Sequence, residues 1–170
     1  NFENPLPLEE KNKHVLVVGQ GPSGFGLAHY LMRAGVHVLA IDGVKIEPLD
    51  DDLLNTTKPI KNIGNYLHSL SQRIVSGFGG VAEYGITVRW NKNNLFLIRL
   101  LLERNRLYTL KGGIYFGTQL TAEHAFSQGI DHIALCTGSG SPRLMGIKNE
   151  LANGILLASD FLMGLQLSSA

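Results

Sequence analysis

The sequence predicts an α/β fold in which helices flank a parallel β-sheet. Short apolar runs rich in β-branched residues, which are typical of strands buried on both faces, alternate with segments of helical periodicity along the 170-residue chain. Near the start, a strand, a glycine turn, a helix and a second strand follow one another, and crossovers of this type are right-handed in nearly every known case. With 44% hydrophobic and 17% charged residues, the chain can bury the core of one domain, or of one piece of a larger protein.

This opening unit is the clearest pattern in the sequence. Residues 15–18 form a continuous apolar run and predict the first strand. Apolar residues at helical spacings then extend from Phe25 to Ala34, and Gly35 is placed to end that helix as a C′ glycine. Residues 36–41 predict the second strand.

The middle of the chain is expected to contain an irregular segment and two helices. Residues 43–59 lack periodicity and contain prolines and an acidic run, which predicts an excursion over the surface. Apolar residues recur at intervals of three and four over residues 60–74 and predict an amphipathic helix that covers one edge of the core. A further helix is expected at residues 92–104, with a core face formed by Leu95, Ile98, Leu101 and Leu102.

Strand patterns return in the last third of the chain. Residues 113–117 and 132–136 are the two candidate strands. Between them, Thr121 is placed to accept a hydrogen bond from the first turn of a short helix, as in a capping box. Residues 159–167 predict a last helix.

The glycine turn at residues 19–24 has the spacing G-x-G-x-x-G. Gly19 allows the tight turn from strand to helix, Gly21 lets the backbone approach a pyrophosphate, and Gly24 lets helix and strand pack closely. Pro22 suits the first helical turn, where its missing N–H costs no hydrogen bond. The N-terminus of the helix then faces the phosphates with unpaired N–H groups and a favourable dipole.

Asp42 stands at the carboxyl end of the second strand, where an acidic side chain accepts hydrogen bonds from an adenosine ribose. A carboxylate there favours an unphosphorylated ribose, as in FAD or NAD, over NADP. Together with its strands and helix, the motif predicts a Rossmann-like dinucleotide-binding domain; the alternative is a glycine-rich turn in a domain that has lost its ligand. Spacing alone does not separate FAD from NAD.

Four blocks of sequence carry a family resemblance. Residues 21–24, Gly-Pro-Ser-Gly, resemble the turn of FAD-containing oxidoreductases with two dinucleotide-binding domains. Residues 79–86, GGVAEYGI, are similar to a segment of the glutamate synthase small subunit and its relatives. Residues 136–143 are similar to the A-T-G strand end of that family, and residues 154–162 to the G-[IV]…D-F-L that follows it. The chain thus resembles the FAD-binding part of the glutamate synthase small (beta) subunit and related FAD-dependent pyridine nucleotide oxidoreductases.

The resemblance implies FAD as cofactor, with NAD(P)H as electron donor in the full-length enzyme. It implies that the FAD pyrophosphate lies against the glycine turn and that Asp42 holds the ribose. Because the flavin performs the chemistry, no catalytic side chain is expected. The implied cofactor-binding residues are Gly19, Gly21, Pro22, Ser23, Gly24, Asp42, Gly79, Gly80, Arg89, Thr137 and Gly138.

Departures from the family pattern indicate a part of a longer chain. The family usually has Glu in place of Asp42, residues 44–76 are an insertion, and a second nucleotide motif and the iron–sulfur cysteines are missing. We expect an N-terminal extension at residues 1–13 and an FAD-binding domain at residues 14–170, passing electrons from NAD(P)H through FAD to a downstream acceptor. Two alternatives remain: a single-domain NAD-binding dehydrogenase, and a catalytically inactive nucleotide-binding fragment or scaffold.

Charge and composition narrow the expected partners. A net charge of +1 gives no field that draws the chain to nucleic acid or acidic lipid. One cysteine and no membrane-length apolar stretch predict a protein of the cytoplasm without a membrane partner, whose partners are the remaining domains or subunits of a larger oxidoreductase. The six histidines lack metal-ligand spacing. A basic stretch is expected to face solvent or to dock to another domain: Arg99, Arg104, Arg106 and Lys111.

Overall fold

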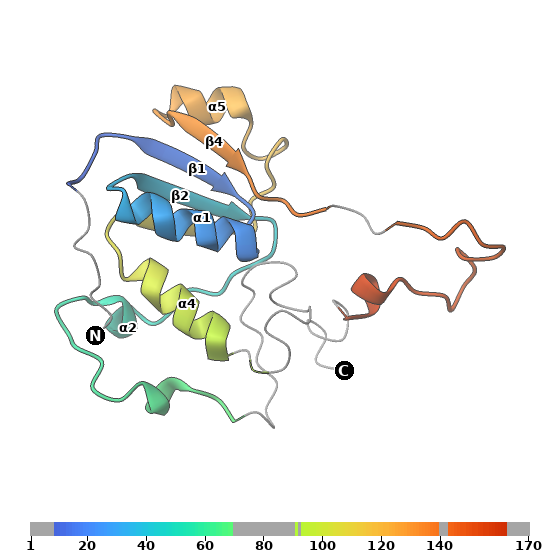
Figure 1. Ribbon diagram of the computed structural model, residues 1–170, viewed down its shortest axis with the longest axis horizontal. Helices are drawn as coiled ribbons and strands as arrows, with labels where there is room; N and C mark the ends of the chain where they lie inside the picture. The colour runs from blue at the N-terminus through green and yellow to red at the C-terminus, as the bar shows by residue number, and fades with distance from the viewer. Residues whose placement is uncertain (1–8, 70–90, 92, 140–142, 163–170) are drawn as a thin grey trace.

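The computed structural model describes residues 9–69, 91, 93–139 and 143–162 (Figure 1). Within these residues the chain forms a four-stranded sheet in the order β3-β2-β1-β4, with every neighbouring pair parallel. This arrangement confirms the predicted α/β fold and has Rossmann-like topology. The strands are β1 (His14–Val18), β2 (His37–Asp42), β3 (Tyr108–Gly112) and β4 (His132–Leu135).

Helices cover both faces of the sheet (Figure 1). Val15 and Val17 of β1 belong to a core that includes α1 (Pro22–Arg33) and α4 (Asn93–Glu103). The alternate residues Leu16 and Val18 belong to a second core, which includes Ala125 of α5 (Ala122–Ser127). Because successive side chains of a strand point to opposite faces, a strand covered on both sides must be apolar throughout. The continuous apolar run in the sequence therefore identified the central strand.

Most of the predicted elements are present with nearly the expected bounds. β1, α1 and β2 match the opening unit, and Gly35, with φ +80°, follows the end of α1. The Thr121 hydroxyl accepts from the His124 N–H at 3.2 Å and so caps α5 as expected. The ladder beside β4 extends to Cys136, whose N–H donates to the Val18 carbonyl at 2.7 Å. Residues 158–162 are helical, and the rest of the last predicted helix lies outside the described residues.

The strand predicted at residues 113–117 is wrong, because the strand is β3 at Tyr108–Gly112. Pairing begins directly after α4, where the Val38 N–H donates to the Leu107 carbonyl at 2.7 Å. Gly113 then takes φ +71° and ends the strand. The alternation of Ile114 and Phe116 that suggested a strand instead reflects their packing against the core beside α5.

The helix predicted at residues 60–74 is also wrong over its described part. Only a 3₁₀ turn, η1 (Ile63–Tyr66), forms, and Leu67 is already extended. The Asn62 side chain accepts from the Gly64 N–H at 2.9 Å, a local bond that competes with helix formation. The His68 N–H and carbonyl then bond to the Asn93 side chain, each at 2.9 Å. Residues 70–74 lie outside the described residues.

The helix α4 follows its prediction, but its buried face differs. Leu95 and Leu102 are buried as expected, whereas Leu101 is 72% exposed. Arg99 is buried in its place: its Nε donates to Glu103 Oε1 at 2.7 Å, and its Nη2 donates to the Glu47 carbonyl at 2.8 Å. The solvent face expected for this arginine is therefore wrong.

The excursion at residues 43–59 is largely irregular, as predicted, with one short helix, α2 (Asp51–Leu54). Arg104 donates to the Leu53 carbonyl at 2.5 Å and to the Lys58 carbonyl at 3.1 Å. These bonds attach the excursion to the end of α4. The prediction that Arg104 faces solvent is therefore wrong as well. Among the described residues, no helix is long and apolar enough to cross a membrane.

Candidate nucleotide-binding site

A cavity of about 380 Å³ lies at the carboxyl ends of β1, β2 and β4. Ligands of open α/β sheets bind at this edge, outside the strand ends. The lining combines the glycine turn, the end of β2, the loop after β3 and the residues that follow β4. Its residues are Val18, Gly19, Gly21, Pro22, Ser23, Asp42, Gly43, Ile114, Tyr115, Phe116, Cys136, Thr137, Gly138 and Ser139.

The backbone around the glycine turn explains two of its three glycines. Gly19 has φ +93°, and a Cβ there would overlap the Cys136 carbonyl oxygen and lie 2.8 Å from its carbon. A Cβ on Gly24 would overlap the Gly19 carbonyl oxygen and lie 2.9 Å from its carbon. Real Cβ atoms do not approach backbone this closely, so both positions require glycine. Gly21 has φ −72° and ψ −174°, an extended conformation open to other residues, so its approach to a pyrophosphate stays a prediction.

The N-terminus of α1 opens onto this cavity. Gly21 is the N-cap, Pro22 occupies the first turn, and both line the cavity together with Ser23. No side chain caps this end, and the first turn contains no acidic residue. The first N–H groups of a 12-residue helix therefore point to a region that favours an anion, by about 0.3 to 1 kcal/mol per charge at an exposed site.

Asp42 is held in a fixed orientation at the end of β2. Its Oδ2 accepts from the Gln20 N–H at 2.6 Å, and its Oδ1 accepts from the Val44 N–H at 2.9 Å. A carboxylate oxygen can accept a second hydrogen bond, so each oxygen keeps acceptor capacity. A pair of fixed acceptors with negative charge suits the two hydroxyls of a ribose and repels a ribose phosphate.

The residues after β4 form another part of the wall. Thr137 and Gly138 line the cavity, and Gly138 has φ +73°. Their contact with FAD stays a prediction. Three predicted residues, Gly79, Gly80 and Arg89, lie outside the described residues. Among the described residues, no group of three His, Cys, Asp or Glu side chains could hold a metal ion.

A segment with two aromatic residues also lines the cavity. The sequence patterns did not predict it as part of the site. Ile114, Tyr115 and Phe116 follow β3, and Tyr115 is 61% exposed. A Cβ on Gly43 would lie 3.0 Å from Tyr115 Cε1, which places this ring beside the residue that follows the carboxylate. Because the segment was assigned to a strand, its position was missed; an aromatic pair between two glycines was the available signal.

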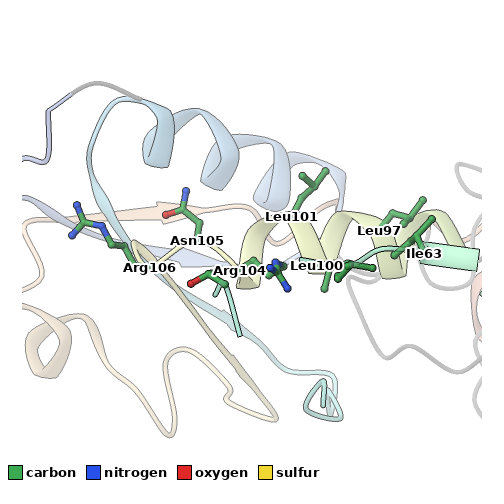
Figure 2. A pocket seen from close by; sticks show the side chains of 9 residues that line it. Ile63, Leu97, Leu100, Leu101, Arg104, Asn105 and Arg106 are labelled. Atoms are coloured by element: carbon green, nitrogen blue, oxygen red, sulfur yellow. The ribbon is translucent and has the colours of Figure 1, made fainter. Parts of the chain in front are cut away.

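A second cavity, of about 790 Å³, lies between α4 and the described part of the insertion (Figure 2). None of the predicted site residues that the structure describes lines it, and its two arginines have other partners: Arg104 holds backbone carbonyls, and Arg106 pairs with Glu10. Ligand sites need a few convergent polar groups, so the smaller cavity at the glycine turn is the better candidate. The larger cavity is lined by Thr56, Ile60, Ile63, Leu97, Leu100, Leu101, Arg104, Asn105 and Arg106.

Comparison with known proteins identifies a close relative of this chain. No protein-family model matches the chain. The chain is 50% identical over 166 residues to an uncharacterized protein of Rickettsia prowazekii (strain Madrid E). The match covers 98% of this chain and 23% of the relative. The chain therefore corresponds to less than a quarter of a much longer protein in that bacterium.

Proposed function

We propose that the chain is the FAD-binding domain of an NAD(P)H-dependent oxidoreductase resembling the glutamate synthase small subunit. One observation supports this most: a cavity at the carboxyl ends of the strands combines an uncapped helix N-terminus, an oriented carboxylate and the residues after β4. The remaining parts of a longer protein would supply the NAD(P)H site and the electron acceptor. Such an enzyme would act in the cytoplasm.

The residues present fit the adenosine diphosphate half of FAD. We expect the pyrophosphate at the N–H groups of α1, whose close approach to the glycine turn depends on Gly24. We expect the ribose at Asp42 and the adenine beside the exposed ring of Tyr115. When bound, the flavin accepts a hydride and passes on electrons; this chain binds and orients it. The same half occurs in NAD, so an NAD-binding dehydrogenase is the second candidate.

A visible absorbance spectrum of the purified chain, followed by release of any cofactor and its identification by mass, tests the proposal. Flavin bands with FAD released are the expected result. A colourless chain is then titrated with FAD, FMN and NAD. Binding of NAD without FAD would favour the dehydrogenase, and binding of none of them would favour a scaffold.

Asp42→Ala is expected to weaken FAD binding by about 1.5 to 3 kcal/mol, because two ribose hydroxyls lose a charged acceptor. This corresponds to an increase in Kd of about 10- to 150-fold. FMN, which lacks the adenosine ribose, serves as the matched ligand and is expected to bind as before. Equal losses for FAD and FMN would mean that Asp42 acts only through the fold of the turn. Asp50→Ala, which removes the cap of α2, is the control variant.

Tyr115→Ala is expected to weaken FAD binding by about 1 to 3 kcal/mol, the range for stacking of a base on an aromatic side chain. Tyr115→Phe keeps the ring and should retain affinity. Tyr30→Ala is the matched control, because Tyr30 is exposed on α1 and does not line the cavity. Isothermal titration with FAD measures all three variants; an unchanged Kd for Tyr115→Ala would remove the ring from the adenine site.

A further inference from the structure

Gln20 is a polar side chain with no exposed surface (0%) in the middle of the glycine turn. The G-x-G-x-x-G motif places no requirement on this position. A buried amide is unfavourable unless its donors and acceptors are paired, so its burial calls for a role. Neither Gln20 nor its partner Tyr108 is among the described residues that line the cavity.

Gln20 joins three parts of the site. Its Oε1 accepts from the Tyr108 hydroxyl at 2.8 Å, and its Nε2 donates to the Gly19 carbonyl at 3.0 Å. Its backbone N–H donates to Asp42 Oδ2 at 2.6 Å. Gln20 thus connects Gly19, the Asp42 carboxylate and Tyr108, the first residue of β3.

Tyr108 is itself held in place. It is buried, and its backbone N–H donates to the Asn105 carbonyl at 3.0 Å, which secures it at the exit of α4. Burial raises the pKa of the Tyr108 hydroxyl, and the carboxylate of Glu103 raises it further. The hydroxyl therefore remains a neutral donor at ordinary pH, and the Gln20 amide keeps one orientation.

We propose that Tyr108 and Gln20 are positioning residues, which set the glycine turn and the Asp42 carboxylate for the phosphates and ribose of the dinucleotide. The inference rests on the proposed function of this site. Without the Tyr108 hydroxyl, Gln20 Oε1 has no donor and the amide loses its fixed orientation. The Gly19 carbonyl and the Gln20 N–H then lose the support that holds them where the cofactor needs them.

Tyr108→Phe tests the proposal, because it removes only the hydroxyl. In the full chain, the Kd for FAD is expected to rise by roughly 10-fold, because binding must then restore the order that the turn has lost. The double variant Tyr108→Phe/Gln20→Leu replaces both polar partners with apolar groups, so stability should return toward the original value. FAD affinity should remain low, since leucine cannot hold the Gly19 carbonyl. Recovery of affinity together with stability would overturn the positioning role.

A second readout separates this inference from the proposed function. In the ligand-free chain, hydrogen exchange of the Gln20 N–H is expected to be roughly tenfold faster in Tyr108→Phe, as its bond to Asp42 loosens. Tyr66→Phe removes an exposed hydroxyl and is the control. A parent chain that binds no dinucleotide would end the proposed function, yet the exchange rate would still show whether Tyr108 and Gln20 hold the turn against Asp42. An unchanged rate in Tyr108→Phe would overturn the positioning role.

Discussion

Gly24→Ala is expected to weaken FAD binding by more than about 100-fold. The added Cβ would overlap the Gly19 carbonyl oxygen and lie 2.9 Å from its carbon, and backbone cannot turn aside as the end of a flexible side chain can. The start of α1 must then move away from the turn, so the N–H groups at its end no longer converge on the pyrophosphate. Loss of two hydrogen bonds to a charged group corresponds to about 3 to 6 kcal/mol. Titration with FAD measures the loss.

Gly26→Ala is the matched control for this substitution. Gly26 lies in the same helix two residues further on, and a Cβ there would meet nothing within 4 Å. Alanine in a helix interior is favoured over glycine by about 0.5 to 1 kcal/mol, so thermal stability should rise slightly while affinity is retained. Equal losses of FAD affinity in the two variants would show that the close packing of Gly24 against Gly19 is not what FAD binding requires.

The opening unit could be predicted because its signals are local. A strand buried on both faces is apolar throughout, and Gly24 is required by the carbonyl of Gly19 in the same turn. Asp42 could be placed because the carboxyl ends of neighbouring parallel strands meet at one edge of the sheet. These parts of the candidate site need little knowledge of the rest of the chain.

The errors fall where distant residues decide the local structure. The strand begins at Tyr108 because pairing with β2 starts as soon as α4 ends, and Gly113 stops it before the apolar alternation that suggested a strand. The segment at residues 60–69 ends in two bonds between His68 and the distant Asn93 side chain instead of following its apolar periodicity. Periodicity reports which residues are buried, but it does not report against what they pack.

The parts of the site that the sequence did not predict have the same origin. Gln20 stands at a position without a sequence rule, and its role depends on Tyr108, which is 88 positions away. Tyr115 reaches the cavity only because β3 ends earlier than its pattern suggested. To predict the roles of both residues, one would need to know which segment pairs with β2.

The insertion can be placed in part. Arg99 and Arg104 bind carbonyls of Glu47, Leu53 and Lys58 and hold the excursion against α4. Of the residues from 44 to 69, none lines the cavity at the glycine turn. This described part of the insertion therefore covers α4 rather than the candidate site.

Arg99→Met is expected to destabilise the chain by about 3 to 5 kcal/mol, the cost of removing one partner of a buried ion pair. Arg99 is only 4% exposed, so its loss leaves the largely buried Glu103 carboxylate without this partner and releases the Glu47 carbonyl. Chemical denaturation followed by circular dichroism measures the change. Arg106→Met is the control, because an exposed pair such as Arg106 with Glu10 contributes about 0 to 1 kcal/mol.

The double variant Arg99→Met/Glu103→Leu separates burial of charge from attachment of the insertion. Replacing both partners by apolar groups of similar size should recover much of the stability, since no uncompensated charge remains. The Glu47 carbonyl stays released in both variants, so the attachment of the excursion contributes to whatever loss persists. Because that segment does not line the cavity, the FAD affinity of the folded molecules should equal that of the parent chain. A lower affinity in the recovered double variant would mean that α4 and its cover support the cofactor site, and would make the insertion a part of it.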